Sequence, residues 1–204
     1  MLQIQSVSHE LLEVLKQLQS NPIFSNFRLV GGTSLALQWG HRVSVDIDLF
    51  ANEFLESDEI ISELNGFKNL KILKKGKLIN VFVINGIKVD IVNYQYRWID
   101  DVIEIEGVRM ASPKDIAAMK INAITGRGSR KDFIDLFYLL KHFSLKDILS
   151  FFEMKYPDAT LFLAYKSLTY FDDADLQESP KLFHSITWNE IKDEIELQYS
   201  KLDI

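Results

Sequence analysis

Cysteine is absent from this chain, and glycine and proline are scarce, with 9 and 4 among 204 residues. The lack of cysteine excludes disulfide bonds, thiolate catalysis and cysteine-based zinc sites. No apolar run approaches the roughly 18 residues of a membrane-spanning helix, and the first residues lack the basic start and apolar segment of a secretion signal. We therefore expect a cytoplasmic protein with no membrane contact.

Basic residues are outnumbered by acidic ones. The 23 lysines and arginines face 29 aspartates and glutamates, which gives a formal net charge of −6. This balance argues against a protein that coats nucleic acid through its overall charge. A local surface for RNA is still offered by one lysine strip, which consists of Lys68, Lys71, Lys74, Lys75 and Lys77.

The hydrophobic pattern divides the chain into a mixed first half and a helical second half, with the boundary near Met110. We expect an α+β protein, with a core lobe that contains a mixed sheet over 1–110 and a helical bundle over 111–204. The expected helices lie at 8–19, 33–39, 112–125, 129–143, 146–154, 158–171 and 188–200, and the expected strands at 27–30, 43–50, 78–84 and 87–94. Asn85-Gly86 separates the last two strands and favours a two-residue hairpin turn, so they should pair antiparallel.

Two carboxylates share one face of the strand expected at 43–50. Apolar residues occupy the odd positions from Val43 to Leu49, and Asp46 and Asp48 project from the opposite face. Their Cα atoms would lie about 7 Å apart, which suits shared coordination of a magnesium ion. The alternative interpretation is the solvated face of an edge strand.

Two further features favour a site at this sheet. Gly31-Gly32 precedes a helix, and a small-residue turn with unpaired helix N-terminal amides can bind phosphate, although it can also be a simple tight turn. Asp90 lies on an apolar strand and supplies a possible third carboxylate, unless it is a solvated edge residue.

A lysine occupies an apolar helical stripe in the second half. Lys120 falls between Ile116 and Ile124 on the helix expected at 112–125. It either snorkels around the edge of the core or reaches an anion such as a triphosphate. Four more cations would add positive charge near such a site or merely serve solubility, namely Arg42, Arg127, Arg130 and Lys131.

The motifs in combination resemble the AbiEii/AbiGii-type toxin nucleotidyltransferases of the DNA polymerase β-like superfamily. The resemblance is carried by Gly31-Gly32-Thr33-Ser34-Leu35, Arg42-x-Ser44-x-Asp46-x-Asp48-Leu49, Ser112-Pro113-x-Asp115-Ile116-x-Ala118-x-Lys120 and Arg130-Lys131-Asp132-x-x-Asp135-Leu136. It covers roughly residues 27 to 140 in the expected order. It implies a nucleotidyltransferase fold for the first lobe, with the helical lobe contributing a lysine and an aspartate to the active-site cleft.

The resemblance also implies roles for individual residues. Asp46 and Asp48 become metal ligands with Asp90 as the third, and Lys120 grips the triphosphate. The last acid of the family pattern is either Asp132 or Asp135. The residues assigned to nucleotide binding are Gly31, Gly32, Thr33, Arg42, Ser44, Lys120 and Arg130.

The implied activity is magnesium-dependent transfer of a nucleoside monophosphate from an NTP to an acceptor hydroxyl, with pyrophosphate as leaving group. By resemblance the acceptor is tRNA, and the protein is a toxin with a partner antitoxin. Two alternatives stay open. One is the same chemistry on a small molecule or a protein hydroxyl, and the other is a module that binds nucleotide or a partner without turnover.

Overall fold

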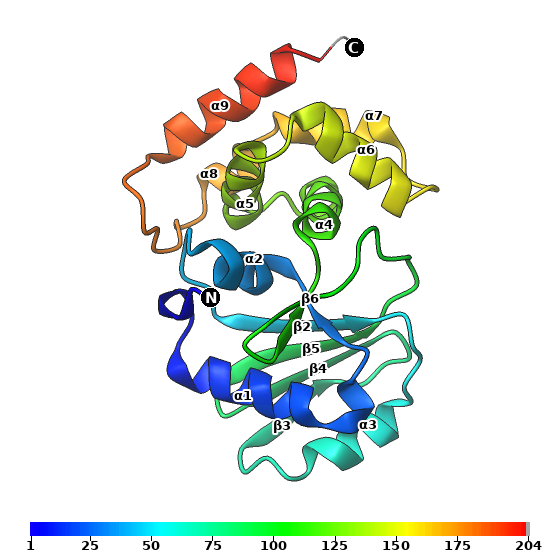
Figure 1. The fold of residues 1–204 in the computed structure, drawn as a ribbon. Coiled ribbons are helices and arrows are strands. Elements are labelled where there is room, and N and C mark those ends of the chain that lie inside the picture. Colours follow the sequence, from blue (N-terminus) through cyan, green and yellow to red (C-terminus); the bar gives the residue numbers. More distant parts are fainter. Residues whose placement is uncertain (203–204) are drawn as a thin grey trace. The chain divides into compact units, whose positions relative to one another are not determined.

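A computed structural model of the chain describes residues 1–202 and divides into two compact units. The first unit comprises Met1–Arg97 with Val102–Ala111, and the second comprises Trp98–Asp101 with the chain from Ser112 onward. The hydrophobic pattern did not predict that Trp98–Asp101 belongs to the second unit. Figure 1 traces the chain through these elements.

The first unit holds the sheet and three α-helices among the described residues. Its elements are η1 (Ile4–Ser6), α1 (His9–Ser20), η2 (Pro22–Phe24), β1 (Arg28–Leu29), α2 (Gly31–Trp39), β2 (Asp46–Ala51), α3 (Ser57–Leu64), β3 (Leu70–Lys74), β4 (Ile79–Ile84), β5 (Ile87–Asn93), β6 (Ile103–Ile105) and β7 (Val108–Met110). Within residues 1–202 the strands form one seven-stranded sheet in the order β3-β4-β5-β2-β1-β7-β6. Because β2 pairs parallel with β5, and β1 with β7, while the other pairs are antiparallel, the sheet is mixed. The predicted α+β class is confirmed.

One face of this sheet is packed against helices. Helices α1 and α3 lie along it in Figure 1, and Leu15 of α1 and Ile60 of α3 share one buried cluster with Ile47 and Leu49 of β2. Since strand side chains alternate, burial of Ile47 and Leu49 directs Asp46 and the residues in phase with it to the opposite face. The core therefore sets which way the carboxylates point.

The second unit consists of α4 (Pro113–Gly126), α5 (Arg130–Leu140), α6 (Leu145–Lys155), α7 (Leu161–Leu168), α8 (Asp172–Asp175) and α9 (Trp188–Ser200). Helix α4 packs against α5, α6 and α7. Its start follows from Ser112, which caps the helix by accepting from the Asp115 amide at 3.1 Å, and from Pro113 in the first turn. No helix within residues 1–202 is long and apolar enough to cross a membrane.

The predicted hairpin between β4 and β5 is confirmed. Ile84 pairs with Ile87, and the connecting residues Asn85 and Gly86 both have positive φ, 52° and 87°. Two positive φ values are what a type I′ turn requires, and Asn-Gly meets that requirement at low cost.

Several boundaries differ from the predictions. Helix α2 begins at Gly31 rather than at residue 33, and β2 begins at Asp46, so the expected strand from residue 43 is too long. Val45 is 64% exposed and does not share the apolar face, because it lies outside the sheet pairing. The helix expected at 158–171 is shorter, since α7 ends at Leu168 and α8 follows.

Candidate active site

Gly31 lies directly against the Asp48 carboxylate. Its φ is +67°, and a Cβ atom at this position would come within 2.7 Å of Asp48 Oδ2. A side chain would therefore be both strained and obstructed here. This close approach also places the carboxylate at the N-terminus of α2, where unpaired amides and the helix dipole stabilise negative charge.

Thr33 and Ser44 join the first turn of α2 to the start of β2. The buried Thr33 hydroxyl donates to the main-chain carbonyl of Asp46 and lies 2.8 Å from the Ser44 hydroxyl. Two contacts from one short side chain fix the helix start relative to the acidic strand. Thr33 and Ser44 thus support the site, and their contact with a nucleotide remains a prediction.

The parallel register of β2 and β5 brings further charged residues to the same face. Asp48 pairs with Asp90, and Asp46 pairs with Lys88. The Lys88 ammonium lies 2.7 Å from each oxygen of the Asp90 carboxylate. Lys88 was not predicted as a site residue, although its position two residues before Asp90 on an expected strand places both on one face.

The nearby carboxylates also affect the pKa of Lys88. Burial alone would lower the pKa of Lys88, but the hydrogen bond to Asp90 and the charges of Asp90, Asp48 and Asp46 outweigh it and raise the pKa. Lys88 is therefore the cation that compensates this acidic face.

The donor set fits a magnesium–nucleotide complex. Carboxylate oxygens are the ligands that magnesium prefers, and this ion is commonly held by one or two carboxylates together with substrate phosphates. Among residues 1–202, no three or more acidic, histidine or cysteine side chains gather closely enough to hold a metal on their own. Asp46 and Asp48 fit the two-carboxylate arrangement, and a ligand role for Asp90 remains a prediction.

Arg42 is buried beside this region rather than a surface residue, with 3% exposure. Its guanidinium donates to the Val43 carbonyl at 3.0 Å. This contact orders the chain that enters β2. Its role in nucleotide binding stays a prediction.

Lys120 in the second unit is 4% exposed, so it does not snorkel to solvent. Its ammonium lies 3.0 Å from Asp132 and 2.6 Å from Asp135, whose carboxylates are fully buried. The anions that Lys120 contacts are therefore carboxylates of the same unit. Its contact with a triphosphate remains a prediction.

Asp132 is the most heavily engaged of these acids. Arg127 donates to both of its oxygens at 2.8 and 3.0 Å, and the Ser129 hydroxyl donates at 2.5 Å. Burial would raise the pKa of Asp132, but the charge of Lys120 and the bonds from Arg127 and Ser129 outweigh it and hold the pKa well below its usual range. The stabilisation from ionised Asp132 is thus present above its unfolded pKa of about 4 and is lost as the pH falls below that value.

Arg130 anchors a different part of the helical unit. Its guanidinium donates to the carbonyls of Ala174 and Asp175 at 2.9 and 2.8 Å and lies 4.9 Å from the Trp188 ring centroid. These contacts hold α8 and the start of α9 against α5. Nucleotide binding by Arg130 remains a prediction.

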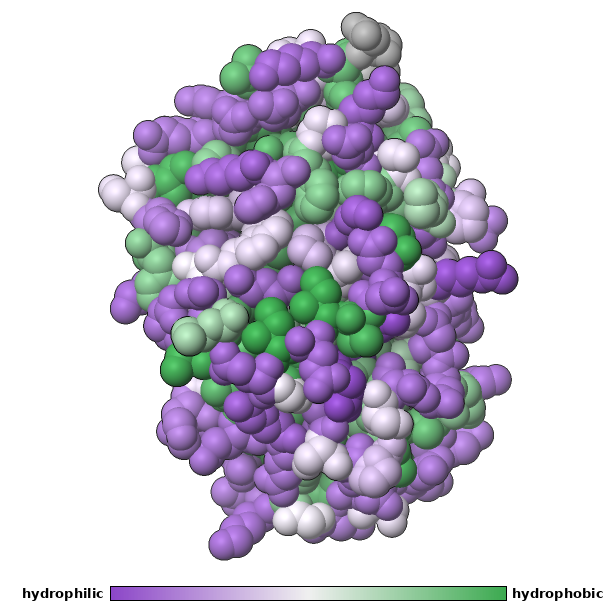
Figure 2. Space-filling model, in the orientation of Figure 1, coloured by the Kyte–Doolittle hydropathy of each residue, from purple (hydrophilic) through white to green (hydrophobic). Residues whose placement is uncertain are grey.

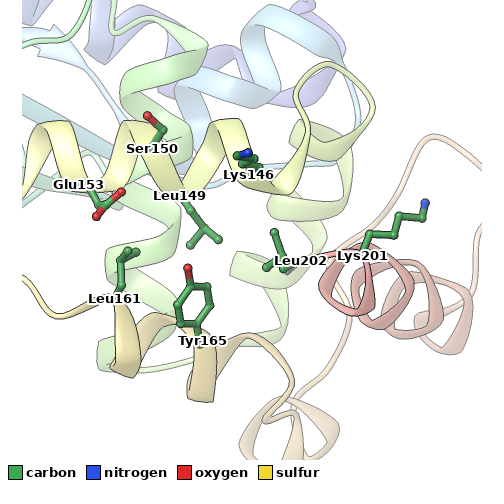
Figure 3. A pocket seen from close by; sticks show the side chains of 8 residues that line it. All are labelled: Lys146, Leu149, Ser150, Glu153, Leu161, Tyr165, Lys201 and Leu202. Carbon is green, nitrogen blue, oxygen red and sulfur yellow. The ribbon is translucent and has the colours of Figure 1, made fainter. Parts of the chain in front are cut away.

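The helical unit also contains a pocket of about 370 Å³. Figure 3 shows Leu149, Leu161 and Tyr165 directed towards its middle, whereas the Lys201 ammonium points away. No predicted site residue lines this pocket, and its charged groups do not converge on one point. It is a pocket of mixed polar and apolar lining between α6, α7 and the residues that follow α9.

Solved structures identify the fold as that of nucleotidyltransferases. A candidate nucleotidyltransferase from H. pylori is 19% identical, with a TM-score of 0.62 and coverage of 95% of this chain and 94% of that chain. MenT4, the nucleotidyltransferase toxin Rv2826c from Mycobacterium tuberculosis H37Rv, is 11% identical, with a TM-score of 0.57 and coverage of 95% and 83%.

The family follows from sequence comparison. The model for the nucleotidyl transferase AbiEii toxin of type IV toxin–antitoxin systems matches residues 13–200. The uncharacterized protein aq_aa25 from Aquifex aeolicus (strain VF5) is 34% identical over 177 residues, which cover 84% of this chain and 86% of the relative. The chain therefore belongs to the AbiEii family and is a nucleotidyltransferase, as the motifs predicted.

Substitution Lys88→Gln should expose the repulsion among the three acids. Without this cation, the metal-free variant should melt below wild type, and magnesium should raise its Tm by more than it raises that of wild type. Thermal melts with and without magnesium measure both effects, with Lys16→Gln on the exposed side of α1 as the control. An equal magnesium increment in wild type and variant would contradict the compensating role of Lys88.

Substitution Lys120→Met should destabilise the helical unit. It leaves two fully buried carboxylates without their shared cation, and breaking a buried ion pair costs about 3–5 kcal/mol in unfolding free energy. Urea denaturation measures this loss. Lys114→Met, on the same helix but paired with the half-exposed Asp100, should cost under about 1 kcal/mol. Equal losses in the two variants would refute the structural role of Lys120.

Proposed function

We propose that this chain uses magnesium to transfer a nucleoside monophosphate from an NTP to a hydroxyl of tRNA, as the toxin of a two-component system. The observation that carries the proposal is the position of Asp48, with Gly31 at the N-terminus of α2 on one side and Asp90 of β5 paired beside it. A helix N-terminus, which is the kind of element that binds phosphate, and a carboxylate face are thereby adjacent.

The chain's own residues would act mainly by positioning. The amides of Gly31, Gly32 and Thr33 would bind the nucleotide phosphates, and Asp46 and Asp48 would hold the magnesium ion. Bound magnesium supplies charge neutralisation at the phosphates. The acceptor hydroxyl then attacks the α-phosphorus and pyrophosphate leaves. Rate enhancement comes from alignment and from charges fixed before the reaction.

The system role is supported by the family description, which names a toxin of type IV toxin–antitoxin systems. We infer a partner antitoxin on that basis. The tRNA acceptor is supported by the resemblance and by the lysine strip of the first unit. A cytoplasmic location accords with an antitoxin partner and with a tRNA acceptor.

Replacement of either strand carboxylate should abolish transfer without unfolding the protein. Asp46→Asn and Asp48→Asn remove charge that holds the metal, and loss of such a group costs on the order of 10²–10³ in rate or more. Single-turnover transfer of an α-labelled NTP measures the effect, with thermal melts to verify folding. Asp158→Asn, an exposed acid of the helical unit, is the matched control. A folded Asp48→Asn variant with wild-type turnover would remove the metal site from the mechanism.

The destination of the label tests the acceptor. Wild-type protein is incubated with magnesium, total tRNA and one α-labelled NTP at a time. Label should be transferred to the tRNA, and prior periodate oxidation of the terminal ribose should block the transfer. Label in protein or in small molecules of a lysate, with none in tRNA, would overturn the tRNA proposal while retaining nucleotidyl transfer.

A further inference from the structure

The carboxylate face of the sheet continues across three more strands. Antiparallel pairing of β5 with β4 sets Val81 opposite Asp90 and Val83 opposite Lys88. Antiparallel pairing of β4 with β3 then sets Lys74 opposite Val81 and Lys71 opposite Val83. Paired residues in neighbouring strands lie on the same face.

Two continuous rows result from this register. One row runs Lys74–Val81–Asp90–Asp48, and the other runs Lys71–Val83–Lys88–Asp46. Adjacent strands are about 4.8 Å apart, so the lysines of β3 stand about 14 Å from the acids of β2. Between them Val81 and Val83 are half-buried and form an apolar floor.

A bulge in β3 produces this alignment. The register shifts between Ile72 and Lys74, so Leu73 is the extra residue and Lys74 takes the position opposite Val81. In a regular strand, Leu73 would occupy that position and Lys74 would pair one residue further along, in the opposite phase. Bulges commonly redirect side chains near functional sites.

The members of the lysine strip differ in whether their side chains have a partner. Lys75 is bound to Asp58 at 2.5 Å, and the Lys77 ammonium lies 5.8 Å from the Phe54 ring centroid. The side chains of Lys71 and Lys74 are exposed and make no hydrogen bond or ion pair within residues 1–202. Figure 2 shows the side of the first unit on which α1 and α3 lie, where hydrophilic residues predominate. The side chain of Lys68, which precedes β3, makes no hydrogen bond or ion pair within these residues either, so Lys71 and Lys74 are the uncommitted lysines that lie in the rows with the carboxylates.

We propose that this face is the track of the acceptor strand. Lys71 and Lys74 bind phosphates of a single RNA strand that crosses Val81 and Val83 and delivers its terminal hydroxyl to Asp46 and Asp48. The inference rests on the proposed function and adds the path of its substrate. An acidic protein partner would contact only the two lysines, so it would not explain why they lie in the same rows as Asp46 and Asp48. An acceptor strand must extend from the lysines to these carboxylates.

The chemistry of the track sets its selectivity. It offers ammonium groups for phosphates and small apolar side chains for sugars and bases, with no aromatic residue in either row. Affinity should therefore come from the backbone and vary little with sequence. Each phosphate contact on a single strand contributes about 0.7 to the slope of log K against log salt, so the two lysines should contribute about 1.4.

The test compares Lys71→Gln/Lys74→Gln with Lys75→Gln/Lys77→Gln, which has the same charge change in the same segment. The probe is a 3′-single-stranded RNA, titrated at 50 and 200 mM salt. The track variant should bind more weakly, and its affinity deficit relative to wild type should shrink about sevenfold at the higher salt. Lys71→Arg/Lys74→Arg should restore affinity, since it keeps both charges.

Separate measurements distinguish the two proposals. Thermal shifts with magnesium and a non-hydrolysable NTP should be the same in wild type and in the track variant, which also verifies folding. If wild type transfers label to tRNA but both glutamine variants bind RNA equally, the track is wrong and the proposed function stands. If wild type transfers nothing to RNA and binds the probe no better than the track variant, both are overturned.

Discussion

The parallel pairing of β2 with β5 is the constraint on which the candidate site depends. It sets Asp48 beside Asp90 and Asp46 beside Lys88, although α3, β3 and β4 separate these strands in sequence. A slip by one residue would turn the acids into the core and expose the apolar residues that alternate with them. Complete burial of Ile47 and Leu49 therefore fixes the site as well as the fold.

The site assembles like charges, which is unfavourable for folding. Two features of the first unit reduce that cost: Lys88 lies 2.7 Å from both Asp90 oxygens, and the N-terminus of α2 lies against Asp48. Neither requires a ligand. The N-terminus of α2 favours an anion, and Lys88 takes the place of a cation beside Asp90. A magnesium–nucleotide complex would therefore bind to a face on which the repulsion between the carboxylates is already reduced. Local conflicts of this kind are typical of functional sites.

Local signals predicted the elements that have strong caps, turns or periodicity. Ser112-Pro113 marked the start of α4, and Asn85-Gly86 marked the hairpin. The short strands β6 and β7 and the edge strand β3 lack such signals, because three to five residues with exposed neighbours show no clear alternation. Sheet order was equally inaccessible, since it depends on pairings between distant segments.

The candidate site was predictable where one strand carried it. Alternation alone placed Asp46 and Asp48 on one face, but the role of Lys88 depends on the β2–β5 register. Lys120 illustrates the opposite difficulty. A lysine in an apolar stripe signals a buried anion, yet the pattern cannot distinguish a ligand from the Asp132 and Asp135 carboxylates that lie beside it.

The helical unit contains a second buried ion pair, which, like that of Lys120, joins a lysine to an aspartate of the same unit. Asp115 accepts from Lys155 at 2.7 Å and from the Ile99 amide at 2.9 Å, and so ties Trp98–Asp101 to α4. Such pairs contribute little net stability compared with apolar packing, but removal of one partner is costly. Family-motif residues of the helical unit are thus already committed to its fold.

Lysines on an edge strand need no functional explanation by themselves, because charge there prevents pairing with other chains. That explanation would be satisfied by lysines on either face of β3. It does not account for the bulge that sets Lys74 opposite Val81, in the row that ends at Asp48. A bulge at Leu73 also interrupts the exposed edge, so protection was available without this alignment. The lysines connect the edge of the sheet to its carboxylates because Lys71 and Lys74 lie on the carboxylate face of β3, and their presence on an edge strand would not be enough.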